Sequence, residues 1–405
     1  MDLSFFSSFG TSLAAKEAQI NTLQQQVASG LSVQTPDQNP AAYETGVLGT
    51  DQVNQLNNDN TTQAAIQAQL GSVSNSYTSM SSVLDNVQGI VQHALNGTTN
   101  SQNMQALATQ VQSAYQQLIS VGNATAPNGT YLFGGSRGGL APFQPNANGD
   151  IVYFGDGASS QATIGQDMTA STIANGDVFL SGLSGDGISN VTASNANTGS
   201  GQVIQQGVVN AAAANAFQQG NAAITVSFAN SGSGTTYTAT QNGSAIASGT
   251  LSASGTGGTT VQLAGADYQI TGSPANGDSF TIAPSRPQSA FALLKTVYNA
   301  LANAATTPAQ VAQTSQVLNQ SLAGLAQYQQ TVVNAQAQNG VTLQAISAAA
   351  AGNSSQASQA QTNVDNATAT NMPLAISNLD QTVTALQAAM KTFGTVQNLS
   401  LFNYL

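Results

Sequence analysis

The residues that could do chemistry in this chain are few and widely spaced. The sequence has one histidine, His93, and no cysteine. A histidine acts as an acid–base catalyst or metal ligand when acidic, cysteine or other histidine partners are near it. His93 lies next to the apolar positions Ile90 and Val91, with no cysteine and no nearby acidic residue. We therefore expect a helix-surface or bundle histidine, and no thiol nucleophile, disulfide framework or cysteine-ligated metal.

Glycine-rich and aspartate-containing stretches also lack the patterns of ligand sites. The segments "GGSRGGL" (134–140) and "GTGGT" (255–259) are not followed by the Gly-Lys-Ser/Thr of a phosphate loop, so tight turns are the better interpretation. "NANGD" (146–150) and "SGDGIS" (184–189) lack the spaced acidic ligands of a calcium loop. We expect no catalytic residue, no cofactor and no metal site, and hence no enzyme.

Charge is scarce along the whole chain. Charged residues make up 5% of the 405 residues, against roughly 25% in ordinary globular proteins. Five Lys and Arg stand against sixteen Asp and Glu, and nucleic acids and anionic membranes both require clustered basic groups. We therefore expect neither nucleic acid nor membrane as a partner. The N-terminal segment lacks the basic and apolar regions of a signal peptide, so we expect export, if it occurs, without a cleaved signal peptide.

The first third of the chain shows long helices with narrow apolar seams. Apolar residues at alternating three- and four-residue steps predict a helix that ends near Gly30, and a new helix can begin at Pro40. A strict alternation over residues 66–91 predicts a long coiled-coil-like helix. A third helix is predicted over residues 104–121 after a polar break.

The sequence changes character between residues 128 and 285. Most glycines lie in this stretch, and short alternating runs between Gly, Asn and Ser clusters predict strands joined by tight turns. No Lys or Arg occurs from Gly138 to Ser285, so the predicted β-rich segment is acidic. Helix returns over residues 291–325, and the clearest seam of all runs over residues 372–393.

These patterns predict an α+β fold, in which both chain ends form a long coiled-coil-like helical bundle around an inserted β-rich domain. We expect residues 1–40 and 366–405 to pair as assembly helices, residues 41–135 and 286–365 to form the bundle, and residues 136–285 to form the outer domain. The alternative is that each seam faces the core of one ordinary bundle. The terminal seams bury too little apolar surface to offset the entropy of ordering them, so we expect a partner outside the chain to complete the burial.

Three stretches resemble the flagellin superfamily. They are "LQQQVASGLSVQTPDQNPAAY" (23–43), "NGTYLFGG" (128–135) with a following "PF" (142–143), and the ending "LQAAMKTFGTVQNLSLFNYL" (386–405). The ending is similar to the "SLFDYL" phrase of the hook-associated proteins at the hook–filament junction, with Asn403 where that family commonly has Asp.

Two further segments bear on this resemblance. "YQITGSPANGDSFTIAPS" (268–285) resembles a segment of the insertion domains of hook-associated proteins. "TNMPLAI" (370–376) departs from the family, which usually carries acidic residues before the last helix. Both this departure and Asn403 remove negative charge, so they put only the electrostatics of the terminal segments in doubt.

The resemblance implies a structural protein of the bacterial flagellum, an adaptor at the hook–filament junction onto which flagellin polymerises. It also implies self-assembly into a ring of identical subunits. The other partners would be a hook-side junction protein, flagellin, an export chaperone and the type III export apparatus, with an extracellular location on the flagellum. The alternatives are a filament flagellin, or a secreted surface adhesin or enzyme carried on a helical stalk.

The candidate assembly residues are the apolar seam positions of the two chain ends. They are Phe6, Phe9, Leu13, Ile20, Leu23, Val27, Leu379, Val383, Leu386, Met390, Phe393, Leu399, Leu401, Phe402 and Leu405.

Overall fold

The computed structural model describes residues 3–96, 101–158, 161–165, 168–171, 174–232, 234–252, 258–304 and 306–402. The chain divides into two compact parts. The terminal part comprises Met1–Gln63, Ile164–Asp167 and Ser347–Leu405, and the central part comprises Ala64–Thr163 and Met168–Ile346.

The helices contain the predicted seams, and α7 extends well beyond the predicted helical stretch, which ended at residue 325. They are α1 (Leu3–Ser29), α2 (Pro40–Leu95), α3 (Ser101–Gly122), α6 (Ala290–Ala302), α7 (Pro308–Thr368) and α8 (Met372–Phe402). Gly30 ends the first helix with a positive φ of 74°, a backbone angle that glycine adopts without strain. Pro40 begins the second, where its missing N–H costs nothing. Both helix boundaries predicted from the sequence are therefore confirmed.

The middle of the chain is rich in strands, with two short helices between them, and the predicted α+β class is confirmed. The strands are β1 (Phe143–Pro145), β2 (Ile151–Tyr153), β3 (Gln161–Gly165), β4 (Met168–Ser171), β5 (Ser189–Ala193), β6 (Gln202–Val208), β7 (Ile224–Ser231), β8 (Gly234–Gln241), β9 (Ser244–Thr250), β10 (Thr259–Leu263), β11 (Ala266–Thr271) and β12 (Ser279–Pro284). The short helices are α4 (Asp177–Leu180) and α5 (Ala211–Gln219), with a 3₁₀ turn at Gly135–Arg137.

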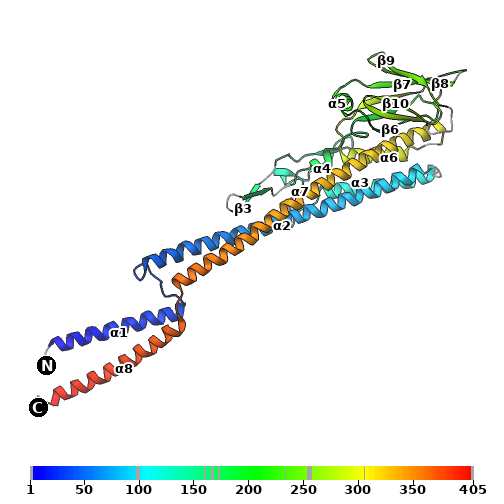
Figure 1. The fold of residues 1–405 in the computed structure, drawn as a ribbon. Coiled ribbons are helices and arrows are strands. Elements are labelled where there is room, and N and C mark those ends of the chain that lie inside the picture. The colour runs from blue at the N-terminus through cyan, green and yellow to red at the C-terminus, as the bar shows by residue number, and fades with distance from the viewer. Residues whose placement is uncertain are drawn as a thin grey trace. The chain divides into compact units, whose positions relative to one another are not determined.

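Two antiparallel sheets form a β lobe over residues 189–284 (Figure 1). One sheet has the strand order β5-β12-β7-β8-β9 and the other has the order β10-β11-β6. Alternate residues of β11 are buried, as expected for a strand with one inward face, and Tyr268 and Ile282 are fully buried between the sheets. The lobe therefore has its own apolar core.

The helical bundle of the central part has a second core. Val87 of α2, Val111 of α3 and Leu294 of α6 are fully buried in it. Phe143 and Phe179 lie outside the long helices and pack with Phe291 in this core. Their ring centroids are 5.0 and 5.8 Å, respectively, from that of Phe291. Chain segments that enter and leave the β lobe thus complete the helical core.

Helix α7 holds the β lobe through glutamine side chains. Gln316 is buried and binds one residue twice: its Oε1 accepts from the N–H of Val203 at 2.9 Å, and its Nε2 donates to the carbonyl of Val203 at 2.6 Å. Gln320 donates to the carbonyl of Val191 at 2.6 Å. Val203 and Val191 belong to β6 and β5, the edge strands of the two sheets. The amides therefore satisfy edge groups that a further strand would otherwise pair.

Candidate assembly interface

The terminal helices α1 and α8 lie side by side (Figure 1). Phe9 of α1 and Phe393 of α8 stack with ring centroids 4.6 Å apart and an interplanar angle of 6°. An aromatic pair of this kind adds about 0.5–1.5 kcal/mol beyond the area it buries. The two residues are 384 positions apart in sequence, so the stack brings the two ends of the chain together.

The predicted seam of α1 faces α8. Ile20 and Leu23 are each 9% exposed, and Phe9, Leu13 and Val27 are half-buried. Their three- and four-residue spacing puts them on one face of the helix, which explains why they share one partner. The side chain of Phe6 lies outside those that the structure describes.

The seam of α8 is only partly covered. Leu379, Val383, Leu386 and Phe393 are half-buried, whereas Met390 is 47% exposed. The neighbouring seam position Ile376 is 45% exposed. Part of the apolar stripe of α8 is therefore left uncovered. The side chains of Leu399, Leu401, Phe402 and Leu405 lie outside the described ones.

Backbone hydrogen bonds fix the start of the terminal pair. The N–H of Ser32 donates to the carbonyl of Thr368 at 2.7 Å, and the N–H of Thr370 donates to the carbonyl of Gly30 at 2.8 Å. Leu31 and Ala369 form an antiparallel bridge between these bonds. The segments that follow α1 and precede α8 are therefore held together as a two-stranded joint, and both helices leave from it.

Close packing of α2 on α7 supports the joint. A Cβ built on Gly46 would lie 2.7 Å from Cγ2 of Thr368, and one built on Gly49 would lie 2.4 Å from Cγ2 of Val364. Both distances are too short for real side chains, and both neighbours are β-branched and stiff. The two glycines allow the helices to approach at the point where the chain turns into the terminal pair.

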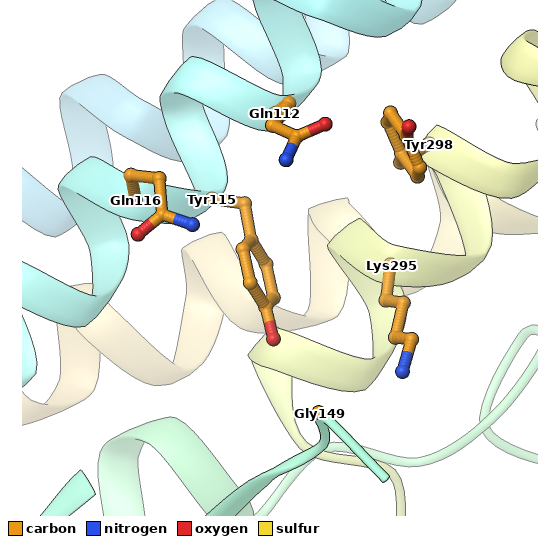
Figure 2. Close-up of a pocket in the computed structure, with 6 residues that line it drawn as sticks. All are labelled: Gln112, Tyr115, Gln116, Gly149, Lys295 and Tyr298. Carbon is orange, nitrogen blue, oxygen red and sulfur yellow. The ribbon is translucent and has the colours of Figure 1, made fainter. Parts of the chain in front are cut away.

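A small pocket lies between α3, α6 and the β1–β2 turn (Figure 2). Its volume is about 240 Å³, and its lining residues are Gln112, Tyr115, Gln116, Gly149, Lys295 and Tyr298. Lys295 binds Asp150 with an Nζ–Oδ1 distance of 2.5 Å, and that hydrogen bond raises the pKa of Lys295. Burial raises the pKa of the Tyr115 hydroxyl. The one cation of the pocket is thus paired within the protein, and neither group is poised as a general base.

Asp278 of the β lobe acts as a structural clamp. Asp278 is 2% exposed and accepts from the N–H groups of Thr198, Gly199 and Ala275 at 2.8, 3.0 and 2.8 Å. This clamp lies in the "YQITGSPANGDSFTIAPS" segment and joins the β5–β6 connection to the β11–β12 turn. A carboxylate enclosed by backbone donors has no face left for a substrate.

A second carboxylate, that of the half-buried Asp186, also accepts backbone hydrogen bonds. Asp186 accepts from the N–H groups of Ile188 and Ser189, and the hydroxyl of Ser189 lies 2.8 Å from that of Tyr268. Burial raises the pKa of Asp186, and it raises the pKa of Tyr268 to about 12. Ser189 and Tyr268 are both almost fully buried, so this hydroxyl network stabilises the lobe and cannot meet a substrate.

Metal and membrane sites are absent from the described part of the chain. No three His, Cys, Asp or Glu residues there are grouped closely enough to hold a metal ion. His93 is exposed near the end of α2, as the sequence led us to expect. Within the same residues no helix has both the length and the apolar character needed to cross a bilayer.

The N-terminal third matches the model of the bacterial flagellin N-terminal helical region over residues 6–137. Over those residues the chain is similar to bacterial flagellins. Flagellar hook-associated protein 3 of Escherichia coli is 30% identical over 120 residues, which cover 29% of this chain and 38% of that protein. Its counterpart in Salmonella typhimurium is 28% identical over 134 residues, covering 33% of this chain and 42% of that protein. The matches thus span about two fifths of the length of these curated relatives.

Solved structures of flagellin-superfamily proteins share the fold. FlgL of Xanthomonas campestris is 24% identical with a TM-score of 0.68, and the alignment covers 78% of this chain and 97% of that one. Hook-associated protein 3 of Legionella pneumophila is 22% identical with a TM-score of 0.71, covering 79% and 98%. The fold that the sequence stretches imply is therefore confirmed.

Proposed function

We propose that this protein is a structural component of the bacterial flagellum and forms the adaptor at the hook–filament junction onto which flagellin polymerises. The observation that carries the proposal is the paired α1 and α8 with an apolar stripe left open on α8. Side chains such as Ile376 and Met390 leave about half of their surface in water, and self-association would remove it. The similarity to hook-associated protein 3 supports the same role.

The partners follow from this role. Copies of the chain would assemble into a ring through the α1–α8 pair, between a hook-side junction protein and flagellin. An export chaperone and the type III apparatus would deliver the chain to the cell exterior without a cleaved signal peptide. The role is structural and needs no catalytic group, which fits the enclosed carboxylates of the lobe.

A charge in the seam tests the proposal. Leu386 is half-buried in the middle of α8, and Leu386→Asp would place an unpaired carboxylate in the contact. Cells that carry this variant should make hooks, lack filaments and release monomeric flagellin. Ala388→Asp is the matched control, because Ala388 lies on the exposed side of the same helix and should tolerate the charge.

Two results would overturn the proposal. Normal filaments with Leu386→Asp would show that this helix has no role in the junction. Filaments that persist after deletion of the whole gene would show that the protein is not the junction adaptor.

A filament flagellin is the second candidate function. The match to the flagellin N-terminal helical region favours it, because filament subunits carry that region too. A filament subunit would be the dominant protein of sheared flagella, whereas a junction adaptor would be a minor one. Quantitative mass spectrometry of a sheared preparation separates the two.

A further inference from the structure

The joint carries a groove that the α1–α8 contact does not use. Its volume is about 530 Å³, and it is lined by Ser29, Leu31, Val33, Gln34, Tyr43, Gly46, Val47, Thr50, Asp51, Val364 and Thr368. Leu31 is 40% exposed and Val47 is 44% exposed, so apolar side chains on two walls face water. Leu48, next to Val47 in sequence, is 61% exposed. Exposed apolar groups gathered at a groove mark a contact surface.

The floor of the groove is built rather than incidental. Thr368 and Val364 of α7 are buried against Gly46 and Gly49, whose lack of side chains lets the helices approach closely. The hydrogen bonds of Ser32 and Thr370 hold the wall that carries Leu31. The groove therefore needs no rearrangement to receive an apolar side chain, and a preformed site loses less entropy on binding.

The open stripe of α8 has the matching chemistry. Met390 is 47% exposed, and Lys391, the only basic residue of α8, follows it directly. Asp51 is the only charged residue among the described groove residues. Met390 is thus complementary to the apolar groove, and Lys391 is complementary to the carboxylate of Asp51. Methionine adapts well to an irregular groove.

The α8 of the same chain cannot supply this side chain. Met372 begins the helix beside the joint, where Thr370 binds Gly30. Met390 is eighteen residues further on, or about 27 Å along the axis at 1.5 Å per residue, and the Phe9–Phe393 stack holds that end against α1. A second copy, displaced along the helix axis, can bring Met390 to the groove.

We propose that the groove at the joint receives Met390 of a second copy, with Lys391 of that copy beside Asp51. This contact rests on the proposed assembly and names the residues through which neighbouring copies are set in register. The exposed ion pair contributes little affinity, since such pairs are worth about 0–1 kcal/mol, but it favours one stagger of α8 over others. The contact makes the joint and the open stripe two halves of one interface.

Engineered cysteines test the contact directly, because the chain has no cysteine of its own. Cells lacking the gene would produce two differently tagged copies, one with Val47→Cys and one with Met390→Cys. Mild oxidation of intact flagella should give a mixed disulfide dimer that carries both tags. A disulfide requires Cα atoms about 4.4–6.8 Å apart, so random collisions contribute little. The control pair is Val47→Cys with Ala388→Cys, which is exposed on the other side of α8 and should stay monomeric.

The outcomes separate this contact from the proposed function. Filaments of normal length with no mixed dimer would overturn the contact and leave the junction role intact. A Val47→Cys copy that is shielded from maleimide on intact flagella, but forms no dimer with Met390→Cys, would place another protein in the groove and also overturn the proposal. If the protein had no junction role at all, the deletion strain would still form filaments, and this result is separate from the disulfide test.

Charge reversal gives an independent readout. Asp51→Lys or Lys391→Asp alone should lower the mixed-dimer yield, roughly two- to five-fold as expected for one exposed ion pair. The double reversal should restore the yield. Asp380→Lys is the control, since it changes the charge of α8 by the same amount elsewhere on the helix. Equal yields in all four variants would show that Asp51 and Lys391 do not meet.

Discussion

Phe9 and Phe393 stack with their ring centroids 4.6 Å apart and their ring planes 6° from parallel. Both rings are half-buried and lie near the distal ends of the described parts of α1 and α8. The stack therefore closes the terminal pair at one end, as the joint at Gly30 and Thr370 closes it at the other.

Removing one ring should open the distal end of the pair. Phe393→Ala loses the stacking contribution of about 0.5–1.5 kcal/mol together with the apolar area of the ring. We expect limited proteolysis of the purified monomer to cut both terminal helices several times faster in this variant. The β lobe should be cut at an unchanged rate, because its core is separate. Equal cleavage of the termini in variant and parent would show that the stack does not hold the pair.

The β lobe should be removable at its neck. Leu183 and Pro287 form an antiparallel bridge, and the N–H of Ser184 donates to the carbonyl of Arg286 at 2.9 Å. A short glycine linker in place of residues 186–284 can therefore join strands that already lie together. Gln316 and Gln320 would then face water, which solvates them well.

We expect this shortened chain to fold and to restore filaments in a deletion strain. A wider cut, from 140 to 283, should fail because it removes Phe143 and Phe179 from the helical core. Circular dichroism and swimming assays compare the two. A soluble, helical and exported short chain that builds no junction would make the lobe part of the contact between subunits.

Asp278 should be one of the costliest residues to change in the lobe. Its buried carboxylate accepts three backbone hydrogen bonds, and Asp278→Ala leaves three donors without their partner. Hydrogen bonds to a charged group are worth about 1.5–3 kcal/mol each, so a loss of roughly 3 kcal/mol or more in the free energy of unfolding is expected. Urea denaturation followed by the near-ultraviolet signal of the lobe tyrosines measures it. Asp267→Ala, on the surface of β11, is the control.

Asp186 should make the lobe less stable as the pH rises. Because burial raises its pKa, the folded lobe binds this proton more tightly than the unfolded chain does. The contribution of Asp186 to stability is thus fully present below the ordinary value of 3.8 and is lost as the pH rises through the folded pKa.

Asp186→Asn can keep the hydrogen bonds from Ile188 and Ser189 without carrying a charge. We expect the Asn variant to unfold at a higher urea concentration than the parent at pH 7, with the difference shrinking toward pH 4. A parent protein that gains stability relative to the variant as the pH rises would contradict the assignment.

The sequence predicted the helices better than their contacts. Gly30 and Pro40 indicate a helix end and a helix start through backbone chemistry alone. The seams indicate which face of each helix is apolar. An apolar seam does not show how much of its surface the partner helix covers. The exposure of Ile376 and Met390 could therefore be learned only from the position of α1.

The glutamine contacts of α7 were beyond the reach of the sequence. Gln316 and Gln320 are ordinary polar residues in a chain rich in glutamine, and nothing near them in sequence marks them as partners of edge strands. Their role depends on sequence separations of more than a hundred residues. The groove at the joint was missed for the same reason, since Val47 and Val364 come to line one groove only when α2 packs on α7. The domain boundaries and the assembly residues remain predictions.

The position of the protein on the flagellum tests the central claim most directly. Asn242 is exposed in the turn between β8 and β9, far in sequence from the seams, and Asn242→Cys gives a single thiol for a gold label. Electron cryomicroscopy of labelled, intact flagella should place the gold in one narrow zone between hook and filament. Gold distributed along the filament would contradict the junction role and identify the protein as a filament subunit.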